Sequence, residues 1–494
     1  MIRTRRWWAI GLCAAVIGLP TPGAHAQPLT FRIEVSPFTA PPRHSYAAGE
    51  VGDWFLFFGG ISGQGLHSLV GGGEPGAVPP SFPVGVFSDQ IAAFNYRTGE
   101  VLTSPVNLLP PDARLALTIT NMPSVQVGSD LLIYGGFGPT ADGADWDTRR
   151  TVTRVNLPAV LAALQQGDPA PASAFTVQTA PDARVAGATI VRLDAQRYAL
   201  IGGSLFLGDY AGNTPFANLY SESVHIYDAG VSITTPVRSF SGATLHRRDM
   251  NALPMTYSSV EGPPVPGFAI AGGVFQNGFF VWENPLFYRD GDPGATDEFF
   301  FLQKMNQYES GALSFYSQRL DENRQILFGG ISSSRFVDGA FVPDIGVPWV
   351  TDITQVRVRG GMYLDETVIG QTPLPTTNVH TFVAPRIPRL PNGQILLDEL
   401  PASEALIARM PCGLRATEPA AAPITVASGA VWNIYATFGL PGDVNRDGRV
   451  DGVDIAYLLS AWGSDATVPD FDLSGVVGPE DLTYLLARFG STSP

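Results

Sequence analysis

The chain has 494 residues, a formal net charge of −15, 45% hydrophobic residues and only 15% charged residues. This composition excludes a disordered acidic chain, a coiled coil and a collagen, and the acidic balance disfavours nucleic-acid binding, which needs a basic surface. The 54 glycines and 42 prolines supply many turns and favour an all-β fold.

Residues 1–26 have the pattern of a secretory signal peptide. They contain three arginines (Arg3, Arg5 and Arg6), an apolar stretch (Trp7 to Leu19) and a small-x-small cleavage site (Ala24-His25-Ala26). The apolar stretch is shorter than the roughly 20 residues that a membrane helix needs. The sequence therefore predicts a secreted protein, extracellular or associated with the cell surface, with no membrane span. Without the signal, Cys412 is the only cysteine, so no intrachain disulfide is expected.

A repeated pattern runs through residues 28–410, in which an apolar strand ends in Gly-Gly. The five copies are Trp54–Gly60, Leu131–Gly136, Tyr198–Gly203, Phe268–Gly273 and Ile326–Gly330. A sixth copy is expected at 394–400, without the glycines. Further strands are expected after the pairs, at Ile91–Tyr96, Val152–Asn156, Val224–Asp228 and Thr354–Val358. Each unit therefore predicts four short antiparallel strands, which is one blade of a β-propeller.

The repeated units resemble kelch repeats. Arg43-His44-Ser45-Tyr46 followed by Trp54–Gly60 is the best copy. The resemblance implies a six-bladed, kelch-like β-propeller over residues 27–410. Strand Phe31–Val35 is expected to complete the sixth blade, beside strands at 379–387, 394–400 and 404–410. The alternative is a pair of β-sandwiches, which gives no reason for Gly-Gly to recur.

Four arginines lie about 16–24 residues before successive Gly-Gly pairs: Arg43, Arg114, Arg184 and Arg248. Propeller geometry would place them on the same face as the long loops. The hypothesis is that they bind an anionic or polyhydroxylated ligand, such as an acidic glycan. The alternative is that they brace neighbouring blades. Aromatic residues of the long loops either stack on sugars or pack their own loops: Trp146, Tyr210, Phe216, Tyr220 and Trp349.

Residues 411–441 are predicted to be a linker, because prolines and alanines gather at Pro411, Pro419, Ala420–Ala422 and Pro423. Residues 442–494 form a separate small domain with an internal repeat of period 27. In each copy a loop rich in Asp and Gly precedes an apolar stripe with helical spacing. The stripes are Ile455, Leu458, Leu459, Trp462 and then Leu482, Leu485, Leu486, Phe489.

The loop spacing predicts two calcium sites, because side-chain oxygens at loop positions 1, 3, 5, 9 and 12 and a backbone carbonyl at position 7 surround a hard cation. The first loop offers Asp443, Asn445, Asp447, Arg449 through its carbonyl, Asp451 and Asp454. The second offers Asp470, Asp472, Ser474, Val476 through its carbonyl, and Asp481. Ser474 supplies less charge than Asp447, so the second site is expected to bind Ca²⁺ more weakly.

This all-α, EF-hand-like unit resembles a type I dockerin, with two calcium loops, each followed by a helix. The resemblance implies docking to a cohesin-like or surface partner. The sequence thus predicts a secreted, non-catalytic binding protein, with a glycan or protein ligand on the propeller and a calcium-binding tail that tethers it. The alternatives are a carbohydrate-active hydrolase that degrades polysaccharide and a structural component of the cell surface. No catalytic residue is assigned.

Overall fold

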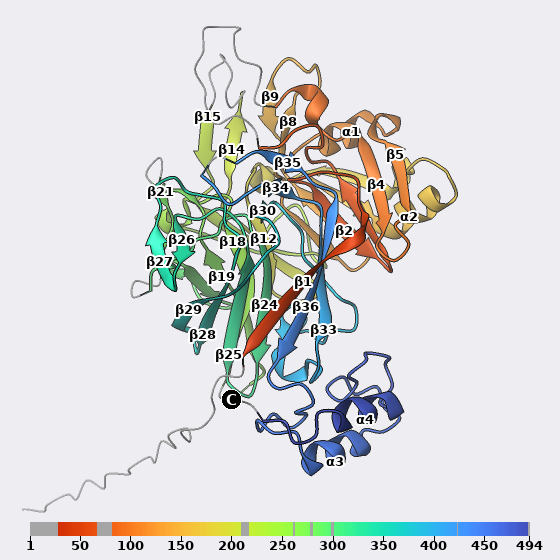
Figure 1. Cartoon of the computed structure of the whole chain (residues 1–494). Coiled ribbons are helices and arrows are strands. Elements are labelled where there is room, and N and C mark those ends of the chain that lie inside the picture. Colours follow the sequence, from red (N-terminus) through yellow and green to blue (C-terminus); the bar gives the residue numbers. More distant parts are fainter. Residues whose placement is uncertain are drawn as a thin grey trace, which may run out of the picture.

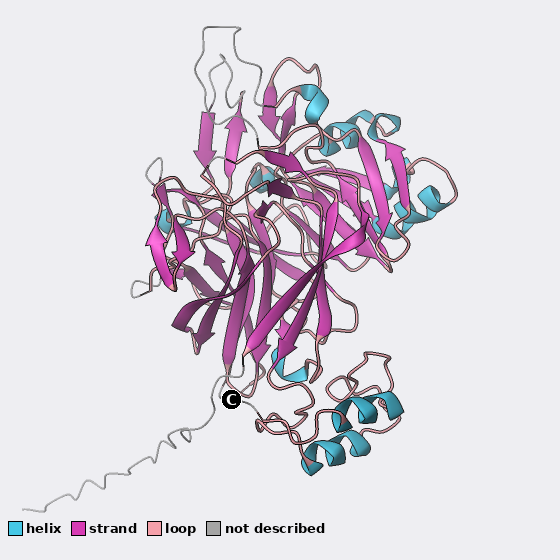
Figure 2. Ribbon diagram, in the orientation of Figure 1, coloured by secondary structure: helices cyan, strands magenta, loops and turns pink. Residues whose placement is uncertain are grey.

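A computed structural model describes residues 28–66, 82–208, 217–259, 262–276, 280–297, 301–421 and 423–492. The predicted signal, residues 1–26, lies outside them. The described chain is mostly β-strand, with small antiparallel sheets in the body and a helical C-terminal module (Figure 2). Among these residues, no helix combines the length and the apolar character needed to cross a membrane.

Among the described residues six main sheets follow one another along the chain, five of four strands and one of five. We call the part that they form, residues 28–441, the β body. The first three are β2 (Ala47–Val51), β3 (Trp54–Phe58), β4 (Gln90–Asn95), β5 (Val101–Pro105); β6 (Ser124–Val127), β7 (Asp130–Tyr134), β10 (Thr151–Asn156), β11 (Phe175–Thr179); and β12 (Thr189–Arg192), β13 (Arg197–Ile201), β16 (Ser223–Asp228), β17 (Arg238–Ser241). The fourth is β18 (Asn251–Tyr257), β19 (Val265–Ala271), β22 (Leu286–Arg289), β23 (Thr296–Asp297).

The fifth and sixth sheets depart from this simple succession. The fifth is β24 (Gly311–Ser317), β25 (Glu322–Phe328), β28 (Asp352–Arg359), β29 (Met362–Gln371), with β32 (Ile395–Leu396) parallel to β24 at its edge. The sixth is β31 (Phe382–Val383), β33 (Ala405–Pro411), β36 (Ala430–Phe438) and β1 (Leu29–Thr39). The first strand of the chain therefore completes the last sheet, and Figure 1 shows β1 in red beside β36 in blue.

Short strands and helices decorate the sheets. The strands are β8 (Phe137–Pro139), β9 (Trp146–Thr148), β14 (Ser204–Leu207), β15 (Ala217–Tyr220); β20 (Val274–Gln276), β21 (Phe280–Val281); β26 (Ser334–Val337), β27 (Ala340–Pro343); and β30 (Thr376–Thr377), β34 (Leu414–Ala416), β35 (Thr425–Ala427). The helices are α1 (Pro111–Leu117), α2 (Leu157–Gln165), α3 (Gly452–Ser460) and α4 (Pro479–Leu486), and six short 3-10 turns accompany them among the described residues.

Each sheet packs face to face on the next one, and the last packs on the first. The second strand of sheet 1, Trp54–Phe58, is a continuous apolar run that is buried along its whole length, which is typical of strands covered on both faces. One apolar cluster joins sheets 1 and 2, and others join each later pair up to sheets 5 and 6. A further cluster joins sheet 6 to sheet 1 through Val431, Cys412 and Phe57. The packing is therefore cyclic.

Two expectations about the last repeat are wrong. Residues 394–400 do not belong to the sixth sheet, because β32 lies at the edge of sheet 5 and Leu397–Glu399 is a 3-10 turn. The predicted linker, residues 411–441, is not a linker, because it contains β34, β35 and the whole of β36, which pairs with β1 and β33. The described residues of the segment rich in proline and alanine lie between β34 and β35.

The C-terminal module consists of α3, α4 and the two loops that precede them. Its core contains Val450, Leu458, Phe471, Val477 and Leu485. The predicted helices are confirmed, and Gly463 and Gly490 follow them with φ of 76° and 87°. The module lies next to the end of the β body that carries β33 and β36 (Figure 1).

Candidate functional site

Six residues, one shortly before the first strand of each sheet, form a ring of backbone hydrogen bonds around the axis of the β body. We call them the ring residues: Ser45, Asn121, Gly187, Asp249, Glu309 and Asn378. All six have φ between 50° and 65°. Each later residue donates its N–H to the carbonyl of the preceding one, at 2.7–3.1 Å. Ser45 Oγ lies 2.9 Å from Asn378 Oδ1 and donates to it, which closes the ring.

The side chains of the ring form a connected polar chain. Asn378 Nδ2 donates to Glu309 Oε2, 2.5 Å away, and the Glu309 and Asp249 carboxyl groups share a hydrogen bond. Asp249 Oδ2 lies 3.1 Å from Nε of Arg248. Burial, followed by the charge of Asp249, raises the pKa of Glu309 well above its usual value. Glu309 therefore keeps its proton to higher pH than a solvent-exposed glutamate does.

Two cavities meet at this ring. The first, about 120 Å³, has a polar floor of ring residues and a largely apolar wall that includes Phe82, Phe137 and Phe206. Arg248 lines it as well. The second, about 170 Å³, lies among ring residues, Ser310 and His380. The buried Ser310 hydroxyl has no hydrogen-bond partner among the described residues, so it faces this cavity with an unmet hydrogen-bonding capacity.

The four predicted arginines do not meet at one site. Arg248 lines the first cavity. Arg43 is 2% exposed and its Nη1 donates to the Gln90 carbonyl at 3.4 Å, so it braces sheet 1. Arg184 pairs with Asp147 at 2.8 Å. Arg114 is exposed on α1.

The four arginines do not meet because each lies a different number of residues before the ring residue of its own repeat. In three of the six sheets the residue two positions before the ring residue has such a bracing role, since Arg43, Arg247 and Gln307 donate to backbone carbonyls. Arg247 is fully buried and donates to the carbonyls of Thr244, Gly272 and Asn284. This position matches the bracing role that was left as the alternative.

Among the described residues, the aromatic side chains of the long loops pack against other parts of the protein. Trp349 is 2% exposed, and Trp146 donates to the Phe82 carbonyl at 3.0 Å. Tyr220 stacks on His246 with ring centroids 3.8 Å apart. Tyr210 and Phe216 lie outside the described residues.

The two predicted calcium loops share one hydrogen-bond pattern. In the first, Asp454 Oδ1 accepts from the N–H of Val444 at 2.8 Å, and Asp443 Oδ2 accepts from the N–H of Gly448 at 2.8 Å. In the second, Asp481 Oδ1 accepts from Phe471 N–H at 2.6 Å, and Asp470 Oδ2 accepts from Gly475 N–H at 2.8 Å. The glycines at position 6 have φ of 90° and 92°. Both loops therefore fold around a common centre with the same register.

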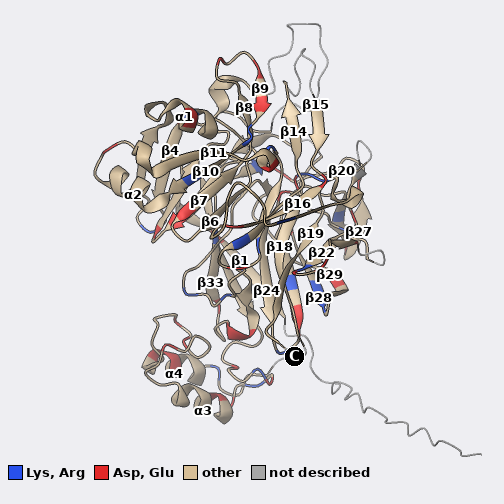
Figure 3. Cartoon of the chain, turned by 180° about the vertical axis from the view of Figure 1, so that it is seen from behind, with Lys and Arg blue, Asp and Glu red and all other residues tan. Residues whose placement is uncertain are grey.

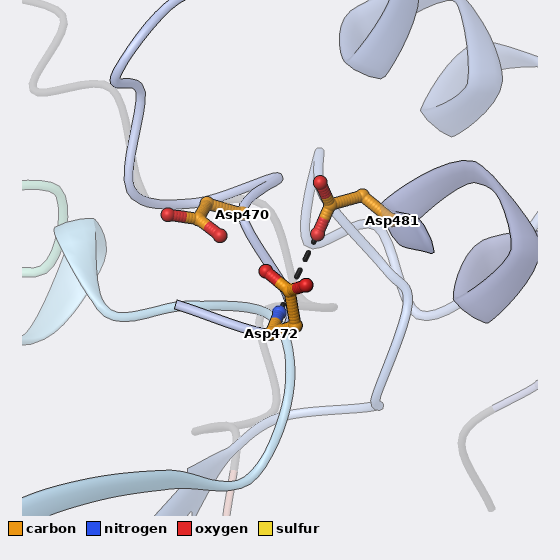
Figure 4. Close-up of side chains that lie close together, drawn as sticks. All are labelled: Asp470, Asp472 and Asp481. Carbon is orange, nitrogen blue, oxygen red and sulfur yellow. Dashed lines mark hydrogen bonds between the residues drawn. The ribbon is translucent and has the colours of Figure 1, made fainter. Parts of the chain in front are cut away.

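The donor set suits a hard cation in both loops. The carboxylates at positions 1 and 12, Asp443 and Asp454 with Asp470 and Asp481, are at most 3% exposed. Carboxylate oxygens of Asp470, Asp472 and Asp481 lie within 4.8 Å of one another (Figure 4). Burial raises the pKa of Asp443 and of Asp470, so their charged forms lack compensation in this environment. Acidic residues concentrate around these loops in Figure 3.

No family model and no curated protein matches the chain. Among solved structures, that of YjhT is similar to the chain over 79% of this chain and 95% of YjhT, with 10% sequence identity and a TM-score of 0.42. A likeness this weak supports no inference about function.

Sequence reasoning missed the ring residues and the carboxyl pair Asp249–Glu309. Their side chains differ from sheet to sheet, and the distance to the Gly-Gly pair varies with the second-strand hairpin. The available signal was a polar or glycine residue suited to positive φ shortly before the first strand of each sheet, preceded in three of the six repeats by a buried Arg or Gln two positions earlier.

Proposed function

We propose that the chain is a secreted, non-catalytic binding protein. Its β body would be a six-bladed, kelch-like propeller with a ligand site at the ring, and its C-terminal module a dockerin-like, calcium-dependent tether. The cyclic packing of six sheets and the closure of sheet 6 by β1 support the propeller interpretation. The observation that carries the ligand proposal is the first cavity, because convergent polar groups beneath an apolar wall are typical of small-molecule sites.

The ligand that fits is a neutral polyhydroxylated molecule, such as one sugar unit of a glycan. Carboxyl, amide and hydroxyl groups of Asp249, Asn121 and Ser45 suit hydroxyl groups, and the Phe137 and Phe206 rings suit the apolar face of a sugar. An anion is disfavoured, because Arg248 is already paired with Asp249 and Glu309 adds a second carboxyl group. This choice departs from the acidic glycan first considered.

The carboxyl pair does not favour a glycoside hydrolase. Hydrolases of that class hold their two carboxyl groups roughly 5 Å or more apart, with the scissile bond between them. Asp249 and Glu309 instead hydrogen-bond to each other. A binding role is therefore the function that this geometry supports best.

Titration calorimetry of the full chain tests the ligand site. The probes are glucose, galactose, N-acetylglucosamine and their short neutral oligosaccharides, with glucuronate and galacturonate in parallel. We expect binding of a neutral probe, weakened about tenfold by Asp249→Ala or by Asn121→Ala, since each removes a ligand hydrogen bond. Arg97→Ala, on an exposed ion pair with Asp53, is the matched control. Stronger binding of the uronates, or none of the neutral probes, would contradict the proposal.

We also propose that the two loops bind Ca²⁺, the first more tightly. Asp443, Asn445, Asp447, Asp451, Asp454 and the Arg449 carbonyl would hold one ion, and Asp470, Asp472, Ser474, Asp481 and the Val476 carbonyl the other. Calorimetry with CaCl₂ should give two binding steps. Asp443→Ala with Asp454→Ala should abolish the tighter one, whereas Glu480→Gln, on an exposed acid of α4, should preserve both. A double variant with unchanged uptake would overturn this assignment.

The tether role is supported by apolar side chains that the module leaves exposed. In each helical stripe the first two members face the module core, whereas the last two, Leu459 and Trp462 or Leu486 and Phe489, are 44–55% exposed. Exposed apolar groups in matched pairs are typical of protein-binding surfaces. A cohesin-like partner is the class that such a module would engage.

A further inference from the structure

The C-terminal module contacts the β body through the same loops that carry the calcium-type ligands. Position 4 of each loop, Arg446 in the first and Leu473 in the second, adopts the left-handed conformation, with φ of 60° and 56°. Both residues lie where their loop contacts the β body. The two contacts are therefore related by the 27-residue repeat.

The first loop is held by Arg446. Its Nη2 donates to the carbonyls of Asp398 at 3.1 Å and Leu400 at 2.9 Å. Its guanidinium lies over the Phe438 ring, 4.5 Å from the centroid, at the end of β36. Burial lowers the pKa of Arg446 to about 10, which reflects how far this side chain is withdrawn from water.

The second loop is held by Arg386, which comes from the β body and donates from Nη1 to the Leu473 carbonyl. The Leu473 side chain packs against the apolar cluster of sheets 5 and 6. A Cβ on Gly475 would lie 2.6 Å from Arg386 Nη1, so the bare glycine backbone allows this approach. Ser403 Oγ adds a bond to the Phe471 carbonyl at 2.9 Å.

The carboxylates of each loop also hold the residues on either side of position 4. Asp454 Oδ1 accepts from Asn445 N–H, and Asp443 Oδ1 accepts from Asp447 N–H, at 3.2 and 3.0 Å. The second loop repeats these bonds around Leu473. We expect mutual repulsion of these carboxylates to open the loops and displace position 4 when no cation is bound, and a bound cation to restore the contact geometry.

We propose that calcium binding fixes the C-terminal module on the β body, through Arg446 and Leu473, rather than only folding a freely tethered module. This inference rests on the calcium binding proposed above. Segment 397–403 and the end of β36 would then become more protected when calcium binds, although neither contains a predicted ligand. The contact also fixes the direction in which Trp462 and Phe489 face a partner.

Hydrogen exchange of the full chain, with calcium or with a chelator, tests the proposal. In the wild type, calcium should slow exchange about tenfold or more both in 443–490 and in 397–403. In Arg446→Ala and in Arg386→Ala, calcium should still protect 443–490 but no longer 397–403. Arg114→Ala, which removes an exposed arginine of α1 in the β body, outside both loops, is the matched control and should behave as wild type.

Calorimetry on the same proteins separates the two proposals. If calcium binds and protects 443–490 of the wild type while exchange in 397–403 is unchanged, the fixed contact is wrong and the calcium sites stand. If no calcium is taken up, both fail together. Equal protection of 397–403 in the wild type and in both contact variants would also overturn the contact.

Discussion

The β body and the C-terminal module are both built from repeats, but they repeat different things. The module repeats side chains: Asp443 and Asp470, or Asp454 and Asp481, make the same bonds. The β body repeats backbone, since its six ring residues share one conformation and one chain of N–H to C=O bonds while their side chains range from Gly to Glu. A repeat of side chains conserves the same chemistry in each copy, whereas a repeat of backbone geometry leaves the side chains free to differ.

The largest effect should come from the buried position that braces the β-body repeat. Arg247→Ala leaves three backbone carbonyls without their donor and removes the guanidinium stacked on Trp282. We expect the free energy of unfolding to fall by about 4 kcal/mol. Urea denaturation measures it. Arg184→Ala, at an ion pair about one-third exposed, should cost less than about 1 kcal/mol. Equal losses would remove the distinction between bracing and surface arginines.

The second test asks whether the ring tolerates a change of side chain when its backbone is kept. Folded Glu309 retains its proton to higher pH than the unfolded chain does, so raising the pH above the usual glutamate range favours unfolding. The wild type should lose up to about 1.4 kcal/mol of stability per pH unit from this group. Glu309→Gln, which mimics the protonated acid beside Asp249 and Arg248, should lack this contribution. Parallel stability curves of the two proteins between about pH 5 and pH 7 would contradict the raised pKa of Glu309.

The third test exchanges the side chains that distinguish the two loops at position 5. Asp447→Ser should weaken the first calcium step about tenfold, and Ser474→Asp should strengthen the second by a similar factor, because charge count tunes such loops. Calorimetry of the two variants and of their combination measures both steps. Val476→Ala, which alters a residue expected to use only its carbonyl, is the control. If the order of affinities persists in the combined variant, position 5 does not set it.

Most of the strands could be predicted from the sequence, because apolar strands that end in Gly-Gly can be recognised without knowing which strands they pair with. The second and third strands of the first sheets and the closing role of Phe31–Val35 are confirmed. The oxygen donors of the two loops in the module could also be predicted, because the same kinds of side chain recur in both copies of the repeat. Calcium itself stays a prediction.

The ring site was out of reach, because it is assembled from backbone geometry. Asn121 and Glu309 share a φ of 52° and the same kind of backbone hydrogen bond, but their side chains differ in chemistry. Hairpins of different length separate them from the glycines used as markers. The four arginines were chosen by their distance from those glycines, and Arg248 alone of the four lines the first cavity.

The sixth repeat failed for a chemical reason that gives the smallest predicted effect. Cys412 and Gly413, with φ of 62° and 102°, stand where the other sheets have Gly-Gly, directly after β33. Cys412 therefore adopts the left-handed backbone conformation, which costs about 1 kcal/mol. The complete burial of its side chain offsets this cost. The Gly-Gly pattern missed this repeat because its first position holds cysteine instead of glycine.

Two substitutions separate these contributions. Cys412→Gly relieves the backbone but loses the buried sulfur, so its stability should lie within about 1 kcal/mol of wild type. Cys412→Ala keeps the strained backbone and also loses the sulfur, so it should be less stable than the glycine variant by about 1 kcal/mol. Denaturation of the three proteins measures this order. An alanine variant as stable as the glycine variant would mean that position 412 bears no strain, and the equivalence with the other five Gly-Gly positions would rest on hydrogen bonding alone.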